Sequence, residues 1–218
     1  MHVPQYRLAP EHPHPAPLLD ALACYEALLR QGLPAGRIVL AGDSAGGALA
    51  LQLAQALKRQ GRPLPAALLL ISPVVDGSLA TARASAQRVR DPMLRLGWLQ
   101  QGLRWHGAMP CAPSPADLAG LPPMLVQVGD QELLLADAEL LAARARAAGV
   151  HCELQVHAAR WHVFHLQGAF LASARNALRD MAGFACTHAG GADVSAQKTE
   201  KACAPEKPSA IVVGSTGA

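Results

Sequence analysis

The stretch Ile38-Val39-Leu40-Ala41-Gly42-Asp43-Ser44-Ala45-Gly46-Gly47 decides the fold of this chain. Its four leading apolar residues predict a buried β-strand, and the glycine-rich turn after them opens a helical pattern of leucines. A serine at a tight turn between a strand and a helix is typical of a nucleophile elbow, which presents the hydroxyl to a base. We expect Gly42 and Gly46 to make room for this turn. A phosphate-binding turn is the alternative, but no Lys-Ser or Lys-Thr pair follows and no G-x-G precedes.

A serine nucleophile of this kind requires an acid and a histidine later in the chain, each just after a strand. His162 is the candidate base because it follows an alternating strand from Val150 to His157. It also precedes a helix that we expect to begin at Phe164, whereas His165 would lie in the first turn of that helix. His162 and His165 have a spacing of three, but no third ligand accompanies them, so the sequence predicts no metal site.

Three carboxylates compete for the role of the acid. Asp130 directly follows the apolar strand at residues 124–128, and Glu132 stands two residues further on. Asp137 is expected to lie already in the next helix. Position alone therefore leaves Asp130 and Glu132 as alternatives.

Six separated motifs resemble, in order, those of the hormone-sensitive-lipase-like (bacterial family IV) esterases. They are Tyr6–Pro13, Gly42–Gly47, Ser72-Pro73, Asp91–Leu94, Leu121–Pro123 and the loop around His162. The resemblance implies an α/β-hydrolase fold, that is, a mostly parallel sheet with helices on both faces. It also implies the hydrolysis of small esters with short or medium acyl chains by Ser44, Glu132 and His162, without a cofactor. The family acid stands two residues before a leucine, and Glu132 fits that register.

The same family carries an H-G-G-G loop upstream of the Tyr6–Pro13 motif, and this chain begins almost at that motif. We therefore expect an amino-terminally truncated α/β-hydrolase in which the amide of Ala45 is the remaining oxyanion donor. Loss of one such donor costs about 10²–10³ in rate. We also expect the first strand near Val3 to Arg7, and the strand at residues 38–41 to lose a neighbour. A gene fragment or a late start codon would explain this beginning.

Other functions stay open at this point. One is an inactive remnant that lacks the oxyanion loop, and the others are a lactone hydrolase or a peptidase that uses the same residues. The resemblance places a cap over the acyl pocket, and Trp98 and Trp105 are the candidate substrate-pocket residues within it.

The alternation of strands and helices predicts one catalytic domain over residues 1–186, with a cap-like insert at 76–114. Residues 187–218 contain no aromatic side chain and are rich in Ala, Gly, Ser, Lys and Glu, so we expect a disordered tail there.

Composition narrows the possible partners. The 218 residues are 51% apolar, enough for a sizeable core, and the net charge of +3 comes without a basic cluster, which argues against nucleic acid. The chain has no apolar stretch near the length of a membrane span. Five cysteines without a C-x-x-C motif suggest reduced thiols and a cytoplasmic location. The expected partner is a small-molecule ester, and an oligomer is left open.

Overall fold

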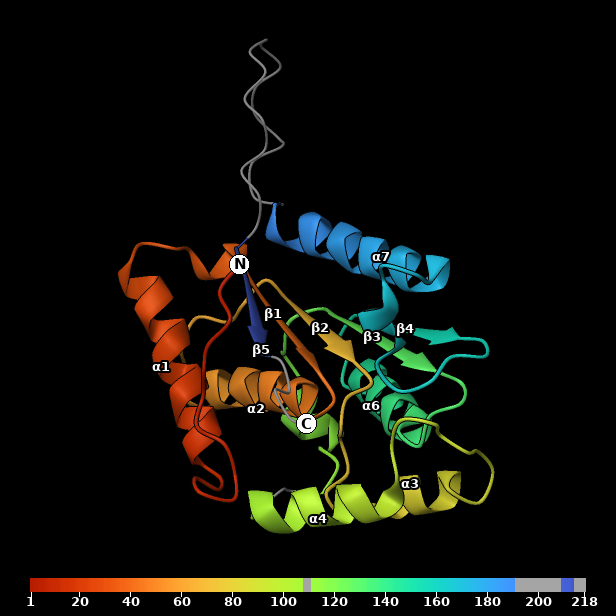
Figure 1. Cartoon of the computed structure of the whole chain (residues 1–218). Helices are drawn as coiled ribbons and strands as arrows, with labels where there is room; N and C mark the ends of the chain where they lie inside the picture. Colours follow the sequence, from red (N-terminus) through yellow and green to blue (C-terminus); the bar gives the residue numbers. More distant parts are fainter. Residues whose placement is uncertain (108–110, 191–208, 214–218) are drawn as a thin grey trace.

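The structure is a computed structural model, and it describes residues 1–107, 111–190 and 209–213. Its centre is a parallel sheet with the strand order β4-β3-β2-β1-β5 (Figure 1). The strands are β1 (Ile38–Asp43), β2 (Ala67–Ile71), β3 (Met124–Gly129), β4 (Cys152–His157) and β5 (Ser209–Val213).

Helices cover both faces of this sheet (Figure 1). They are α1 (Ala16–Arg30), α2 (Ala45–Arg59), α3 (Ala80–Ser85), α4 (Leu96–His106), α5 (Pro115–Leu118), α6 (Leu135–Ala147) and α7 (Ala172–Ala189), with short 3-10 turns η1 (Ala35–Arg37) and η2 (Phe164–Gln167). Helices α2 and α6 pack on one face, with α1 against α2, and α7 packs on the other. This arrangement confirms the predicted parallel α/β fold.

Strand β2 is apolar along its whole length and β1 over its first four residues, because helices cover both faces of the sheet there. In β1, Ile38 and Leu40 belong to the core shared with α1, α2 and α6, whereas Val39 belongs to the core under α7. All three side chains are fully buried. Successive side chains of a strand point to opposite faces of the sheet, so one apolar run contributes to both cores.

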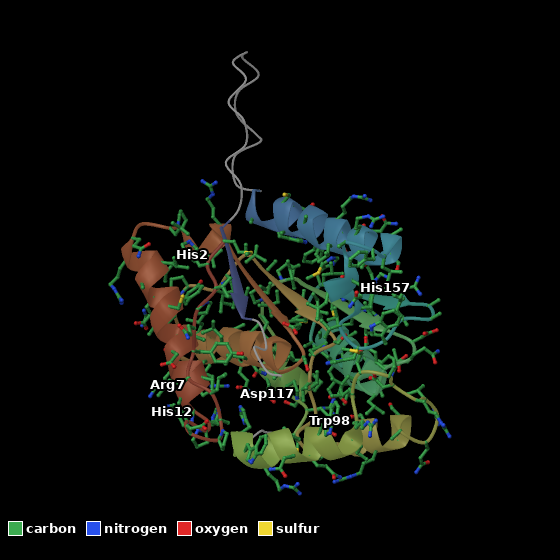
Figure 2. The ribbon with its side chains drawn as sticks, in the orientation of Figure 1. His2, Arg7, His12, Trp98, Asp117 and His157 are labelled. Atoms are coloured by element: carbon green, nitrogen blue, oxygen red, sulfur yellow. The ribbon has the colours of Figure 1, made fainter. Side chains whose placement is uncertain are left out.

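The amino-terminal segment differs from our expectation. Residues 3–7 form no strand, and Arg7 instead forms an ion pair with Asp20 of α1, with Nη2 2.8 Å from Oδ1. Figure 2 shows Arg7 and His12 along the segment that runs beside α1. A β-strand needs a neighbouring strand to pair with its backbone N–H and C=O groups. This segment lies beside a helix, which does not provide such a partner.

Two more differences lie in the second half of the chain. The last long helix begins at Ala172 and not at Phe164, because residues 164–167 form the separate turn η2. Parts of the segment expected to be disordered belong to regular elements, since α7 continues to Ala189 and Ser209–Val213 pairs with β1. The edge of β1 that we expected to be unpaired is therefore paired. The rest of the expected tail, residues 191–208 and 214–218, lies outside the described residues.

Helices α3 and α4 lie within the region 76–114 that we expect to be a cap-like insert, and that domain division stays a prediction. In the part of the chain that the structure describes, no helix has the length and apolar character needed to cross a membrane. Four cysteines there, Cys24, Cys111, Cys152 and Cys186, are free thiols.

Candidate active site

Ser44 lies at the turn between β1 and α2, where the sequence predicts a nucleophile elbow. Its backbone has φ +51° and ψ −116°, a conformation that a residue with a Cβ adopts only when its surroundings hold it. The Ser44 amide donates to the carbonyl of Ile71 at 2.8 Å, and its carbonyl accepts from the amide of Val74 at 3.1 Å. A Cβ on Gly47 would lie 2.9 Å from Cβ of Pro73, so this close approach requires glycine. The elbow is thus clamped between β1, α2 and the end of β2.

The structure brings Ser44, His162 and Glu132 into one hydrogen-bonded series. The Ser44 Oγ is 3.0 Å from Nε2 of His162, and Nδ1 of the same ring is 3.1 Å from Oε2 of Glu132. Glu132 is fully buried and His162 is 8% exposed. In such a series the imidazole can accept the hydroxyl proton, while the carboxylate orients the ring and stabilises its charged form.

The second oxygen of the Glu132 carboxylate is also bonded. Its Oε1 accepts from the hydroxyl of Ser72 at 2.8 Å and from the amide of Gly129 at 2.6 Å. The Ser72 hydroxyl in turn accepts from the amide of Val163, the residue after His162, at 3.4 Å. A carboxylate that is fully bonded on both oxygens is fixed in orientation.

The other two carboxylates face elsewhere. The Asp130 carboxylate accepts from the side-chain amide of Gln131 at 3.1 Å in an exposed position. Asp137 accepts from the backbone amide of Val75 at 2.8 Å and bonds the hydroxyl of Thr81, and burial raises the pKa of its carboxyl group. Both groups are therefore tied to the local backbone or surface and not to His162.

Two residues of this site were missed by reasoning from motifs. Ser72 enters the sequence analysis only as part of a family motif, and Gly129 does not enter it. A Cβ on Gly129 would overlap the carbonyl of Arg160, so glycine is needed for the loop that carries His162 to pass this strand. Ser72 has a φ of +44°, which only the folded structure reveals.

Backbone strain gathers at the same edge of the sheet. Among the described residues, five that are not glycine have positive φ, namely Ser44, Ser72, Leu79, Ala159 and Val163. Four of them lie in the loops that follow β1, β2 and β4, around the hydrogen-bonded series. Strain of this kind is characteristic of sites where geometry is held for a purpose.

His165 occupies a different environment from His162. Its Nε2 is 2.9 Å from the side-chain oxygen of Gln127, and its Nδ1 is buried without a partner. Burial, together with His157 nearby, lowers the pKa of His165 to about 4. The ring is therefore neutral at physiological pH and holds β3 against η2. No group of three or more His, Cys, Asp or Glu suited to a metal is present among the described residues.

The remaining predicted positions surround Ser44 or lie on the cap-like region. Ala45 is exposed at the first position of α2, where backbone amides have no helical partner and the helix dipole favours negative charge. Trp98 and Trp105 lie on α4 with 62% and 51% of their surface exposed, and Figure 2 shows Trp98 on that helix. Their assignment to a substrate pocket stays a prediction.

Comparisons with known proteins identify the family of this chain. A family model described as an α/β-hydrolase fold matches residues 1–166. An acetyl-hydrolase of Streptomyces hygroscopicus is 39% identical over 191 residues, and an esterase of Acinetobacter venetianus is 36% identical over 192 residues. Each alignment covers 85% of this chain, and the chain spans 64% and 63% of the length of these relatives.

The solved structures give the same result. An esterase from the bacterial hormone-sensitive lipase family is 40% identical with a TM-score of 0.79, over 85% of this chain and 65% of that one. A hormone-sensitive lipase from a metagenome library is 38% identical with a TM-score of 0.77, over 84% of this chain and 65% of that one. The parallel sheet, the elbow and these similarities together show that the chain belongs to the α/β-hydrolase-fold family of hormone-sensitive-lipase-like esterases.

Proposed function

We propose that this chain carries the catalytic centre of a carboxylic ester hydrolase that acts on small esters with short or medium acyl chains. The observation that carries the proposal is the hydrogen-bonded series from Ser44 through His162 to Glu132, with links of 3.0 Å and 3.1 Å. The relatives named acetyl-hydrolase and esterase support the same class of reaction.

The reaction proceeds in two halves. Ser44 Oγ forms a bond to the ester carbonyl carbon while its proton passes to Nε2 of His162. The bond from that carbon to the alcohol oxygen then breaks, and the alcohol leaves with the proton from His162. Water then gives a proton to His162 as its oxygen bonds to the acyl carbon, the bond from that carbon to Ser44 Oγ breaks, and Ser44 takes the proton back from His162 as the acid leaves. Glu132 keeps the ring oriented throughout.

The carbonyl oxygen becomes negatively charged in each half and requires donors. The amide of Ala45, at the start of α2, is the donor that we assign from the described residues, and the α2 dipole acts in the same direction. Each oxyanion donor contributes a factor of about 10²–10³ to the rate. The turnover of this chain therefore depends on how many further donors surround the carbonyl.

A fluorophosphonate probe tests the nucleophile directly, because it reacts with an activated serine and needs no turnover. The folded chain should be labelled, Ser44→Ala should abolish labelling, and Ser114→Ala, at an exposed serine before α5, should leave it unchanged. Labelling of Ser44→Ala at the level of the parent chain would remove Ser44 from the proposal.

The acid is tested by a matched pair of isosteric substitutions. Glu132→Gln removes the charge that faces His162, so the labelling rate and kcat should fall by about 10² or more. Asp130→Asn removes an exposed charge two residues away and should change both by less than about twofold. A larger effect of Asp130→Asn than of Glu132→Gln would assign the role of the acid to Asp130.

Substrate panels separate the remaining alternatives. We expect turnover of p-nitrophenyl esters with short acyl chains and little turnover of lactones or peptide anilides. Labelling of Ser44 without turnover of any ester would instead indicate an inactive remnant. If Trp98 and Trp105 line the acyl pocket, Trp98→Ala should shift the preferred acyl length and leave acetyl-ester turnover largely intact.

A further inference from the structure

Strand β1, which leads into Ser44, has a neighbour on each side. Strand β2 pairs with one edge, and β5, from the far end of the chain, pairs in parallel with the other. Strand β5 lies beside β1 (Figure 1). The register runs from Ile38 opposite Ser209 to Gly42 opposite Val213.

The pairing is compatible with the composition of both segments. The sequence Ser-Ala-Ile-Val-Val at residues 209–213 has no proline and no charge, and three of its five residues are β-branched, as strands prefer. The edge of β1 carries backbone donors and acceptors that need partners, because its side chains Ile38, Val39 and Leu40 are buried on both faces. A short extended apolar segment is the kind of partner that such an edge accepts.

Strand β5 ends close to the elbow in the strand register. Its last paired residue lies opposite Gly42, two residues before Ser44. Strand β5 also contacts α2, which begins at the residue after Ser44. The C-terminal strand therefore contacts both arms of the turn, and that turn holds a residue at φ +51°.

We propose that β5 is a positioning element for the nucleophile: Ser209–Val213 of the same chain pairs with β1 and contacts α2, and so holds the elbow between them in its strained geometry. The effect on chemistry rests on the proposed role of Ser44, whereas the effect on β1 does not. A strained turn persists only when the elements on either side of it are fixed. Loss of β5 should therefore loosen β1 first and reduce the reactivity of Ser44 as a result.

Two truncations test this inference. A chain ending at Pro208 lacks β5, and a chain ending at Val213 keeps it and serves as the control. Hydrogen exchange of residues 38–43 should rise by about tenfold or more in the shorter chain, relative to residues 124–129 in β3, which keeps both neighbours. Fluorophosphonate labelling of Ser44 should fall by about tenfold in the shorter chain and stay unchanged in the control.

Proline substitutions test the same point in the full-length chain. Successive amides of an edge strand point alternately toward its neighbour and away from it, so Ile211→Pro or Val212→Pro must remove a donor to β1. One of these two variants should reproduce the increased exchange of residues 38–43, and Ala204→Pro, which precedes Ser209–Val213 in the sequence, should not. Parent-like exchange in both variants would overturn the proposal even if the truncated chain fails to fold.

Two further outcomes are informative. Protection of residues 38–43 that disappears on dilution would show that the strand comes from a second copy, which overturns pairing within one chain. If residues 38–43 respond as expected but Ser44 is never labelled, even in the full chain, the strand pairing stands and the proposed hydrolase function fails.

Discussion

Glu132 is held by more groups than the imidazole that it faces. A buried carboxylate is stable only when its oxygens are bonded, and here the Ser72 hydroxyl and the Gly129 amide bond the oxygen that His162 leaves free. Ser72 also connects the end of β2 to the loop of His162 through the amide of Val163. One hydroxyl thus joins three loops, and we expect it to act on the reaction by positioning Glu132.

We expect Ser72→Ala and Ser72→Gly to lower kcat by about tenfold with little change in KM, because both remove one bond to Glu132. The two differ in their backbone. Glycine tolerates the φ of +44° and alanine does not, so the glycine variant should be more stable by about 1 kcal/mol in urea unfolding. A glycine variant that turns over as fast as the parent would show that the hydroxyl is not the cause.

Among the secondary-structure elements, β3 and α2 each approach a neighbouring segment closely at a glycine. The end of β3 passes the backbone of Arg160 at Gly129, and the start of α2 passes Pro73 at Gly47. Each contact involves backbone atoms, which cannot move aside as a flexible side chain can. The loops that carry Ser44, Glu132 and His162 therefore lie close to one another where a strand end, at Gly129, and a helix start, at Gly47, have no side chain.

Gly129→Ala should destabilise the fold by about 1–3 kcal/mol in urea unfolding, because the added methyl overlaps the Arg160 carbonyl. It should also slow fluorophosphonate labelling, since the loop that bears His162 has to move. Gly36→Ala is the matched control: a Cβ there meets nothing within 4 Å, and stability should change by less than about 0.5 kcal/mol. Equal stability of both variants would contradict the close approach.

Across the whole molecule, a polar network connects the sheet to the layer on its α7 face. The Gln127 side-chain nitrogen donates to the carbonyl of Ala177 in α7 at 3.0 Å and to Gln155 of β4 at 2.7 Å. Its oxygen faces Nε2 of His165, so that nitrogen carries the proton of the neutral ring. Protonation of the buried Nδ1 would place a charge where no partner exists, which explains the lowered pKa of His165.

This network predicts a loss of stability in acid. The pKa of His165 is about 4 in the folded state, against an ordinary value of 6.5, so the unfolded chain binds more protons between these two values. The contribution of His165 to the free energy of unfolding is present above about pH 6.5 and is lost as the pH falls toward about 4. We expect a decrease of about 1–3 kcal/mol from this group.

The measurement is the Tm of the parent and of His165→Gln between neutral pH and about pH 4.5. The Tm of the variant should fall less steeply with decreasing pH than the Tm of the parent. Some decrease should remain, because burial also lowers the pKa values of His157 and His106. His12→Gln, at an exposed histidine, should keep the slope of the parent. Identical slopes for parent and His165→Gln would exclude His165 as the acid-sensitive group.

Several features of this protein could be predicted from the sequence because they depend on neighbours along the chain. The apolar run at residues 38–41 and the glycine-rich turn after it are local patterns, and they predicted β1, the elbow at Ser44 and α2. The order of serine, acid and histidine, each after a strand, also follows from local patterns. In parallel sheets these strand ends meet at one edge, so the sequence predicts that the three candidate residues lie together, and their catalytic role stays a proposal.

Other features were decided only by the tertiary structure, because they depend on contacts between residues far apart in sequence. Ser72 meets Glu132 across 60 positions, and this contact has no signature in either local segment. The same holds for the carboxylate that faces His162 and for the space that Gly129 leaves to Arg160. The pairing of β5 with β1 is the extreme case: the β-branched residues at 209–213 favour a strand, but only the fold brings the edge of β1 to them as a backbone partner.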